Sequence, residues 1–150
     1  MKTNLYETDF YAWTVQQADL LRERCLEQLD FVNLIEEIES LGKQQRQELC
    51  NRLVILIGHL LKWDYQPEKR SKSCFVSIRN QRRQIKILLK LNLSLKPFIQ
   101  EALEISFPLA VDLVVSETPL QNRDLPSYSP YTWEQLLDPS FPSSLAEADF

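Results

Sequence analysis

The sequence predicts an all-α fold: a single-domain helical bundle of four to five main helices, with a long central helix at about residues 31–65 and a short C-terminal helix. Three observations support this. Residues 31–65 contain no proline and can stay helical almost throughout. The chain has only two glycines, so glycine-turned β-hairpins are hard to build. Its 150 residues, 44% of them hydrophobic, can bury the core of one domain spanning 1–150.

The first helix is expected to begin after Asp9, whose side chain can cap it, and to run to about Leu29. Its apolar residues recur at roughly helical spacing, from Phe10 and Trp13 to Leu20 and beyond. Asp30 can then cap the long helix.

The long helix changes character along its length. In its first half, an apolar stripe recurs on one side and is expected to face the core; its members are Phe31, Leu34, Ile35, Ile38 and Leu41. One continuous helix is predicted, although Gly42 could kink it or end it briefly. From Leu49 to Leu61 apolar residues occur all round the helix, which predicts burial on several sides.

The later segments predict two more helices and a short one. We expect a third helix at about 73–91 and a fourth that Ser94 caps and Pro108 kinks or restarts. Residues 116–131 are proline-rich and should be extended, and Thr132 with Gln135 forms a capping box for the short helix. Residues 142–150 are small and acidic, and we expect them to fray.

Several segments resemble one mainly bacterial family, the domain of unknown function 29. They are Tyr6-x-x-Asp9-Phe10-x-x-Trp13, Gln17-Ala18-x-Leu20-Leu21-Arg22, Asn33-Leu34-x-Glu36-Glu37-Ile38-Glu39-x-Leu41-Gly42, His59-Leu60-Leu61-Lys62-Trp63-x-Tyr65-Gln66-Pro67, Ile78-x-x-Gln81-Arg82 and Trp133-x-x-x-Leu137-Asp138 before Phe141. They follow one order over nearly the whole chain. The resemblance implies an all-helical fold and brings no activity with it.

A polar stripe within the long helix is the first candidate site. Gln45, Arg52 and His59 are seven residues apart and fall near the apolar side, and Glu48 lies one turn before Arg52. One interpretation is a pocket in which Arg52 binds an anion and His59 titrates. The other, which the pattern favours, is a buried polar network that fixes the helix register.

The sequence contains few of the motifs that form catalytic or metal-binding sites. Glu36 with Glu39, and Glu101 with Glu104, have the E-x-x-E spacing of Mg²⁺-dependent nucleotide hydrolases, but the first pair points away from the predicted core side. The one histidine excludes histidine-rich metal sites, and there is no G-x-S-x-G elbow or Gly-rich phosphate loop. We therefore expect no cofactor and no resident metal, with a Mg²⁺-dependent hydrolase as a second alternative.

The third helix carries a coherent cationic side, which we call the basic face. Its members are Arg79, Arg82, Arg83, Lys86 and Lys90. From Lys62 to Lys90 the chain has nine Lys or Arg against two acids, although its formal net charge is −4. Such a face could be a plain solvated surface, or it could bind an acidic protein or a nucleic-acid backbone. The acidic pI of about 5.1 argues against nucleic acid, because phosphate binding depends on a basic surface.

The leading hypothesis is a non-catalytic interaction or regulatory module that presents the basic face to an acidic protein partner. The alternative is nucleic-acid binding by the same face, and self-association as a homodimer is a further expectation. The N-terminus has no apolar run of a signal peptide and no segment suits a membrane span. The three cysteines, Cys25, Cys50 and Cys74, are odd in number, far apart in sequence and without a C-x-x-C motif, which favours a reduced cytoplasmic setting.

Overall fold

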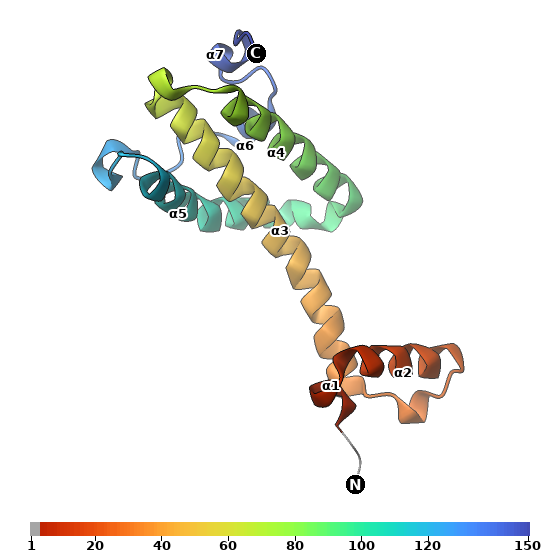
Figure 1. Ribbon diagram of the computed structural model, residues 1–150. Helices are drawn as coiled ribbons and strands as arrows, with labels where there is room; N and C mark the ends of the chain where they lie inside the picture. Colours follow the sequence, from red (N-terminus) through yellow and green to blue (C-terminus); the bar gives the residue numbers. More distant parts are fainter. Residues whose placement is uncertain (1–3) are drawn as a thin grey trace. The chain divides into compact units, whose positions relative to one another are not determined.

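The computed structural model describes residues 4–150, which form helices and 3-10 turns without a strand, so the all-α prediction is confirmed (Figure 1). Contacts between Cα atoms divide the chain into two compact units, here called unit 1 (up to Gln44) and unit 2 (Gln45–Phe150). One long helix, α3 (Phe31–Tyr65), contributes its first part to unit 1 and its second part to unit 2. The expectation of a single domain over 1–150 stays a prediction.

Unit 1 consists of α1 (Leu5–Thr8), α2 (Phe10–Arg22), a 3-10 turn (Leu26–Gln28) and the first part of α3. Asp9 caps α2 as expected, because its side chain accepts a hydrogen bond from the Ala12 amide at 3.1 Å. The helix ends earlier than the sequence suggested. Arg24 has a φ of 58°, in the left-handed region, which a continuing α-helix cannot accommodate.

The packing of unit 1 centres on Trp13, which is buried and whose indole Nε1 donates a hydrogen bond to Asp30 Oδ2 at 3.1 Å. Tyr6 packs edge-on against Trp13 and donates a hydrogen bond from its hydroxyl to Glu37 Oε1. Both contacts reach the side of α3 that carries Asp30 and Glu37. That side lies about 90° round the helix from the middle of the apolar stripe.

The expectation that this stripe faces the core is therefore wrong. Phe31, Ile35, Ile38 and Leu41 are all exposed, and only Leu34 is half-buried. The pattern identified an amphipathic helix correctly, but α1 and α2 cover its neighbouring polar side. The helix also continues without a break at Gly42.

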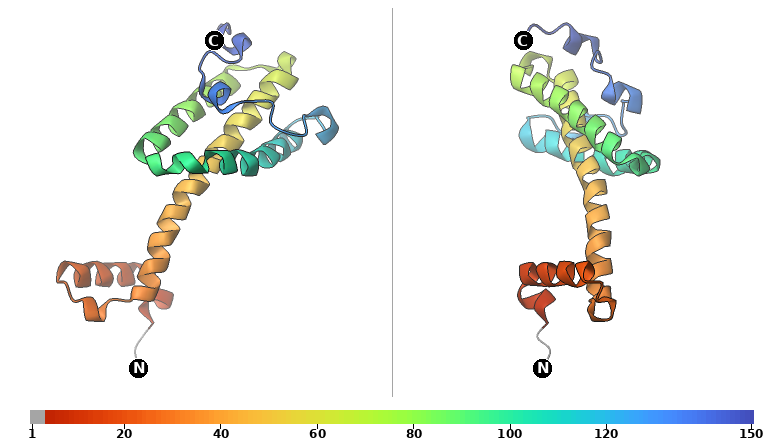
Figure 2. Two further views of the ribbon diagram at one scale, coloured as in Figure 1. Left: turned by 180° about the vertical axis from the view of Figure 1, so that it is seen from behind. Right: turned by 90° about the vertical axis from the view of Figure 1, so that its right-hand side faces the viewer.

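Unit 2 is built round the second part of α3. Its residues Leu49, Leu53, Leu56, Ile57, Leu60 and Leu61 are completely buried, as their all-round apolar pattern predicted. They pack with α4 (Lys72–Leu91) and α5 (Ile99–Glu117) into one hydrophobic core (Figures 1 and 2). A Cβ at the buried Gly58 would lie 3.0 Å from Leu113 Cδ2. The absence of a side chain at this position therefore lets α3 and α5 approach closely.

The connections of unit 2 include three 3-10 turns, Pro67–Lys69, Leu93–Phe98 and Asn122–Asp124. Ser71 caps α4 by accepting a hydrogen bond from the Cys74 amide. Ser94 was expected to cap the following helix, but it lies inside the second turn, and α5 begins at Ile99. Helix α5 also passes through Pro108 without ending there.

The C-terminal segment returns to the core instead of fraying. Helix α6 (Trp133–Leu137) has the predicted capping box, with both hydrogen bonds between Thr132 and Gln135 present. A further short helix, α7 (Ser143–Ala146), follows it. Leu145 is buried, and Trp63 Nε1 donates a hydrogen bond to Ser144 Oγ at 3.0 Å. Residues such as Leu145 therefore attach the acidic tail to the core, although its overall composition suggested that it would fray.

Candidate functional site

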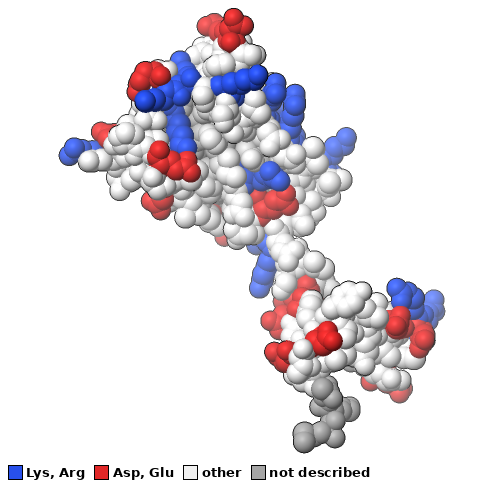
Figure 3. All heavy atoms as spheres, viewed as in Figure 1, with Lys and Arg blue, Asp and Glu red and all other residues white. Residues whose placement is uncertain are grey.

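Four members of the basic face are exposed on α4: Arg79, Arg83, Lys86 and Lys90. At 100° per residue they fall within an arc of about 60°, because their spacings of four, three and four residues follow the helical repeat. None of the four forms an ion pair with any residue of the described range 4–150. Figure 3 shows Lys and Arg side chains gathered over the part of unit 2 that contains α4.

Arg82 does not belong to this exposed face, and its assignment is corrected here. Its side chain is buried, and its guanidinium donates hydrogen bonds to three backbone carbonyls of the C-terminal segment: Leu136 at 2.7 Å, Gln135 at 3.1 Å and Phe141 at 2.6 Å. Burial lowers the pKa of Arg82, and the Asp138 carboxylate opposes that change. On the helix, Arg82 lies about 20° from the buried Leu89, so it sits at the border between the basic and apolar sides.

Because Arg82 holds the C-terminal segment against α4, the two enclose a groove, which we call the α4 groove. Its volume is about 270 Å³. Basic side chains line one part of it and apolar side chains the other; the former are Arg79, Arg82, Arg83 and Lys86, and the latter are Phe75, Pro139 and Leu145. The cavity is slightly below the roughly 300–1,000 Å³ of typical small-molecule sites. It is therefore better matched to one or two side chains of a peptide than to a whole metabolite.

The electrostatics of the groove are cationic. The guanidinium of Arg79 lies over the ring of Phe75, 5.6 Å from its centroid, so the aromatic ring also helps to position it. One acid interacts with the charges of Arg82 and Lys86: Asp138, whose pKa is lowered mainly by hydrogen bonds from Ser140 and less by those two charges. Asp138 is ionised at neutral pH and its hydrogen bonds are made with Ser140. The groove can therefore offer Arg79, Arg83 and Lys86 to carboxylates from another molecule.

The polar stripe of α3 does not form one buried network. Arg52 contacts Glu48 at 3.4 Å, and their side chains are 29% and 44% exposed. A second hydrogen bond, of 3.3 Å, joins Arg52 to Gln81 of α4, a partner that the sequence of α3 alone does not reveal. Gln45 is half-buried and makes no side-chain hydrogen bond with another residue in the described part of the chain.

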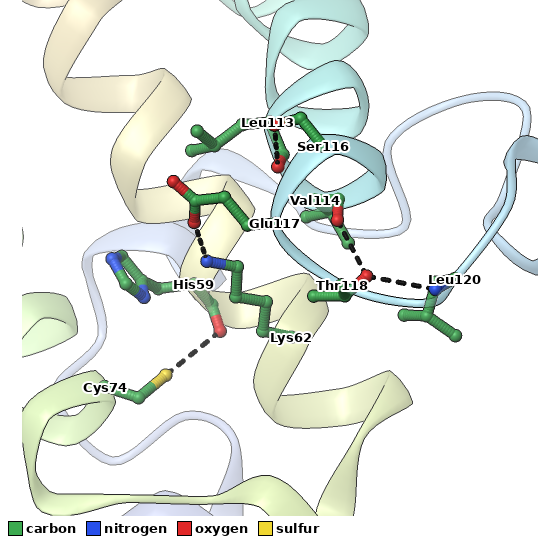
Figure 4. Close-up of polar contacts among 9 residues, drawn as sticks. All are labelled: His59, Lys62, Cys74, Leu113, Val114, Ser116, Glu117, Thr118 and Leu120. Carbon is green, nitrogen blue, oxygen red and sulfur yellow. Dashed lines mark hydrogen bonds and ion pairs between the residues drawn. The ribbon is translucent and has the colours of Figure 1, made fainter.

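His59 lies in a different environment, about 10 Å along the helix from Arg52. Its Nδ1 is buried and has no hydrogen-bond partner among residues 4–150. Burial and the charge of Lys62 lower its pKa, while Glu117 raises it, so the imidazole is neutral at pH 7. Figure 4 shows that Lys62 forms an ion pair with Glu117 and that Cys74 donates a hydrogen bond to the His59 carbonyl.

Neither this environment nor the cysteines show the features of nucleophilic catalysis. Burial raises the pKa of the Cys74 thiol, and it also raises the pKa of Cys50, so both are protonated at neutral pH. A reactive cysteine instead needs a lowered pKa. Cys50 lies in the hydrophobic core, and Cys74 is half-buried and packs against it.

The four glutamates of the hydrolase alternative are exposed: Glu36 and Glu39 in unit 1, and Glu101 and Glu104 on α5 in unit 2. Within residues 4–150, no three His, Cys, Asp or Glu side chains are grouped closely enough to hold a metal ion. The geometry thus adds no support to a Mg²⁺-dependent hydrolase.

Comparison with known proteins gives one result on ancestry. The sequence model of a family described as "Domain of unknown function DUF29" matches residues 5–142. No curated protein and no solved structure matches the chain significantly. In the described range, none of the helices is both long and apolar enough to cross a membrane.

Proposed function

The chain belongs to the DUF29 family, whose description assigns no activity, and we propose that it is a non-catalytic cytoplasmic interaction module that binds an acidic segment of a protein partner in the α4 groove. One observation carries the proposal. Three exposed cations without ion-pair partners in residues 4–150 lie beside an apolar surface in the same groove.

The spacing of the cations suits a peptide. Arg79, Arg83 and Lys86 lie on successive turns of α4, so their Cα atoms span about 10 Å along the helix. Acidic side chains of an extended peptide that point to the same side are about 7 Å apart, so two of them can contact these cations together. Arg residues also bind carboxylates with two parallel hydrogen bonds, which gives directional recognition.

The apolar part of the groove supports a peptide over a nucleic-acid backbone. Phe75, Pro139 and Leu145 can bury an apolar side chain of the partner, and such an anchor contributes much of the affinity of protein interfaces. A phosphate backbone would leave that surface unused. The formal net charge of −4 also weakens attraction to a polyanion at a distance.

The cytoplasmic setting rests on the cysteines. Cys25, Cys50 and Cys74 are free, and a thiol persists most readily where the surroundings are reducing. We therefore expect the partner to be a cytoplasmic protein as well.

The experiment is selection of random twelve-residue peptides on the full chain. We expect the selected peptides to combine two or more Asp or Glu with an apolar anchor, and to lose at least tenfold in affinity for a variant with Arg79→Glu, Arg83→Glu and Lys86→Glu. The matched control reverses three exposed cations outside the groove, Lys43→Glu, Lys69→Glu and Arg123→Glu, and should bind normally. Selected peptides without acidic residues, or equal binding by both variants, would overturn the proposal. So would tighter binding of single-stranded RNA or DNA by the wild type.

A further inference from the structure

Unit 1 has an apolar surface that its own residues leave uncovered. The exposed fractions are 55% for Phe31, 55% for Ile35, 65% for Ile38 and 60% for Leu41. Of residues 4–44, the described part of unit 1, only Trp13 and Gln17 are buried, although the unit is about 40 residues long. Segments of that size rarely bury enough surface to be stable without disulfides, metals or another chain.

The stripe, in which Leu34 is half-buried and the other members are exposed, follows the pattern of a helix-pairing surface. Phe31, Leu34, Ile38 and Leu41 are separated by three, four and three residues, which is the a/d spacing of a coiled coil. From this register we infer that a second copy of the chain covers the stripe, so that the first parts of two α3 helices pack against each other and form a homodimer. This inference is independent of the α4 groove.

The neighbouring residues permit such a pairing. Between Phe31 and Gln45 the positions that flank the a/d residues are Ile35, Glu37, Gly42 and Gln44, of which one is charged. Glu37 already accepts a hydrogen bond from Tyr6. Gly42 leaves space at the contact, because a Cβ there would meet nothing within 4 Å. Two copies can therefore approach without opposing rows of like charge.

The available area is adequate for a stable dimer. Of the nineteen large apolar side chains exposed among residues 4–150, ten lie in unit 1. At an order of 100 Å² each, they offer about 1,000 Å² per copy, and the stripe alone about 400 Å². A standard interface buries about 800 Å² per partner, so the inferred dimer needs the stripe together with further exposed apolar side chains of unit 1.

The first test is the mass of the full chain in solution, measured by analytical ultracentrifugation over a range of micromolar concentrations. We expect a dimer for the wild type and a monomer for Ile38→Glu, with unchanged helical circular dichroism. The control Leu91→Glu changes a more exposed apolar residue, 76% accessible, in unit 2 and should remain a dimer. A monomeric wild type, or an Ile38→Glu variant that dimerises as well as the control, would overturn the inference.

The second test does not require the fold to tolerate a charged residue at position 38. Ile38 lies at the middle of the stripe, so it faces its own copy whether the two helices run parallel or antiparallel. In a Cys25→Ser background, Ile38→Cys should form an intermolecular disulfide with a mild oxidant, and Glu36→Cys, about 160° away on the helix, should not. Equal cross-linking at both positions, or none at position 38, would contradict the dimer. Peptide binding by the α4 groove should be unchanged in Ile38→Glu, which separates this test from that of the proposed function.

Discussion

At the level of single residues, Arg82 and Arg52 each occupy the environment that the sequence predicted for the other. Arg82 was assigned to the exposed basic face and is buried, whereas Arg52 was assigned to a buried network and is 29% exposed. The sequence could not separate them, because each lies at the border of an apolar stripe. The difference is decided by which neighbouring segment covers that border, and this depends on contacts far apart in sequence.

The two arginines therefore predict different effects on stability. Arg82→Met should lower the free energy of unfolding by about 3 kcal/mol, because it leaves three carbonyls of the C-terminal segment without donors. Arg52→Ala should cost less than about 1 kcal/mol, because its pair with Glu48 is partly exposed. Urea unfolding followed by circular dichroism measures both, and equal losses would contradict the buried position of Arg82.

His59 predicts a pH dependence of stability. Its pKa is lowered in the folded chain, so below its ordinary value of 6.5 the unfolded chain takes up the proton more readily than the folded one. The free energy of unfolding should then decrease as the pH falls from above 6.5 down to the lowered pKa. His59→Gln should reduce this decrease, and since the chain has one histidine, no other imidazole contributes in this range. An unchanged pH profile would show that His59 is solvated.

Helix α3 shows what an apolar pattern does and does not determine at the level of elements. Both of its parts were predicted to be helical and both are, over the expected 31–65 range. From Leu49 to Leu61 the second part is apolar on several sides and mostly buried, with Val54 and Ile55 half-buried and Asn51 exposed. The first part has a single stripe, and a stripe indicates which side avoids water without indicating what covers it. Its cover by a second copy is therefore inferred from the exposure of the stripe together with its a/d spacing.

The continuity of α3 at Gly42 gives a further prediction. Because a Cβ at this position would meet nothing within 4 Å, Gly42→Ala should stabilise the chain by about 0.5–1 kcal/mol through its better helix propensity. The measurement is the urea midpoint at constant m value. A destabilised variant would contradict an unbroken helix with open space at residue 42.

The C-terminal segment is the element that sequence reasoning placed least well. Its small and acidic composition suggested fraying, yet Leu145 is buried and Phe150 packs near Trp63 and Phe75. The signal was present in these two apolar residues but was outweighed by their surroundings. Since Pro139 and Leu145 supply the apolar part of the α4 groove, the groove itself could not be predicted from the pattern of α4 alone.

For the whole molecule, the sequence sufficed for fold class, the long helix and the family. Family membership follows from segments spread over nearly the whole chain, and the matched range of 5–142 agrees with them. The candidate site was only half predictable: Arg79, Arg83, Lys86 and Lys90 share an exposed face because helical geometry is regular. Arg82 and the apolar lining required the tertiary fold, which local periodicity does not encode.

The binding of an acidic peptide tests the central claim most directly. The measurement is the dissociation constant, by fluorescence anisotropy, of a labelled peptide with two Asp residues flanking a Phe, at two salt concentrations. For the wild type we predict affinity that weakens as salt rises, and at least tenfold weaker binding for the triple reversal of Arg79, Arg83 and Lys86. Equal dissociation constants for the wild type and this triple variant would contradict the account.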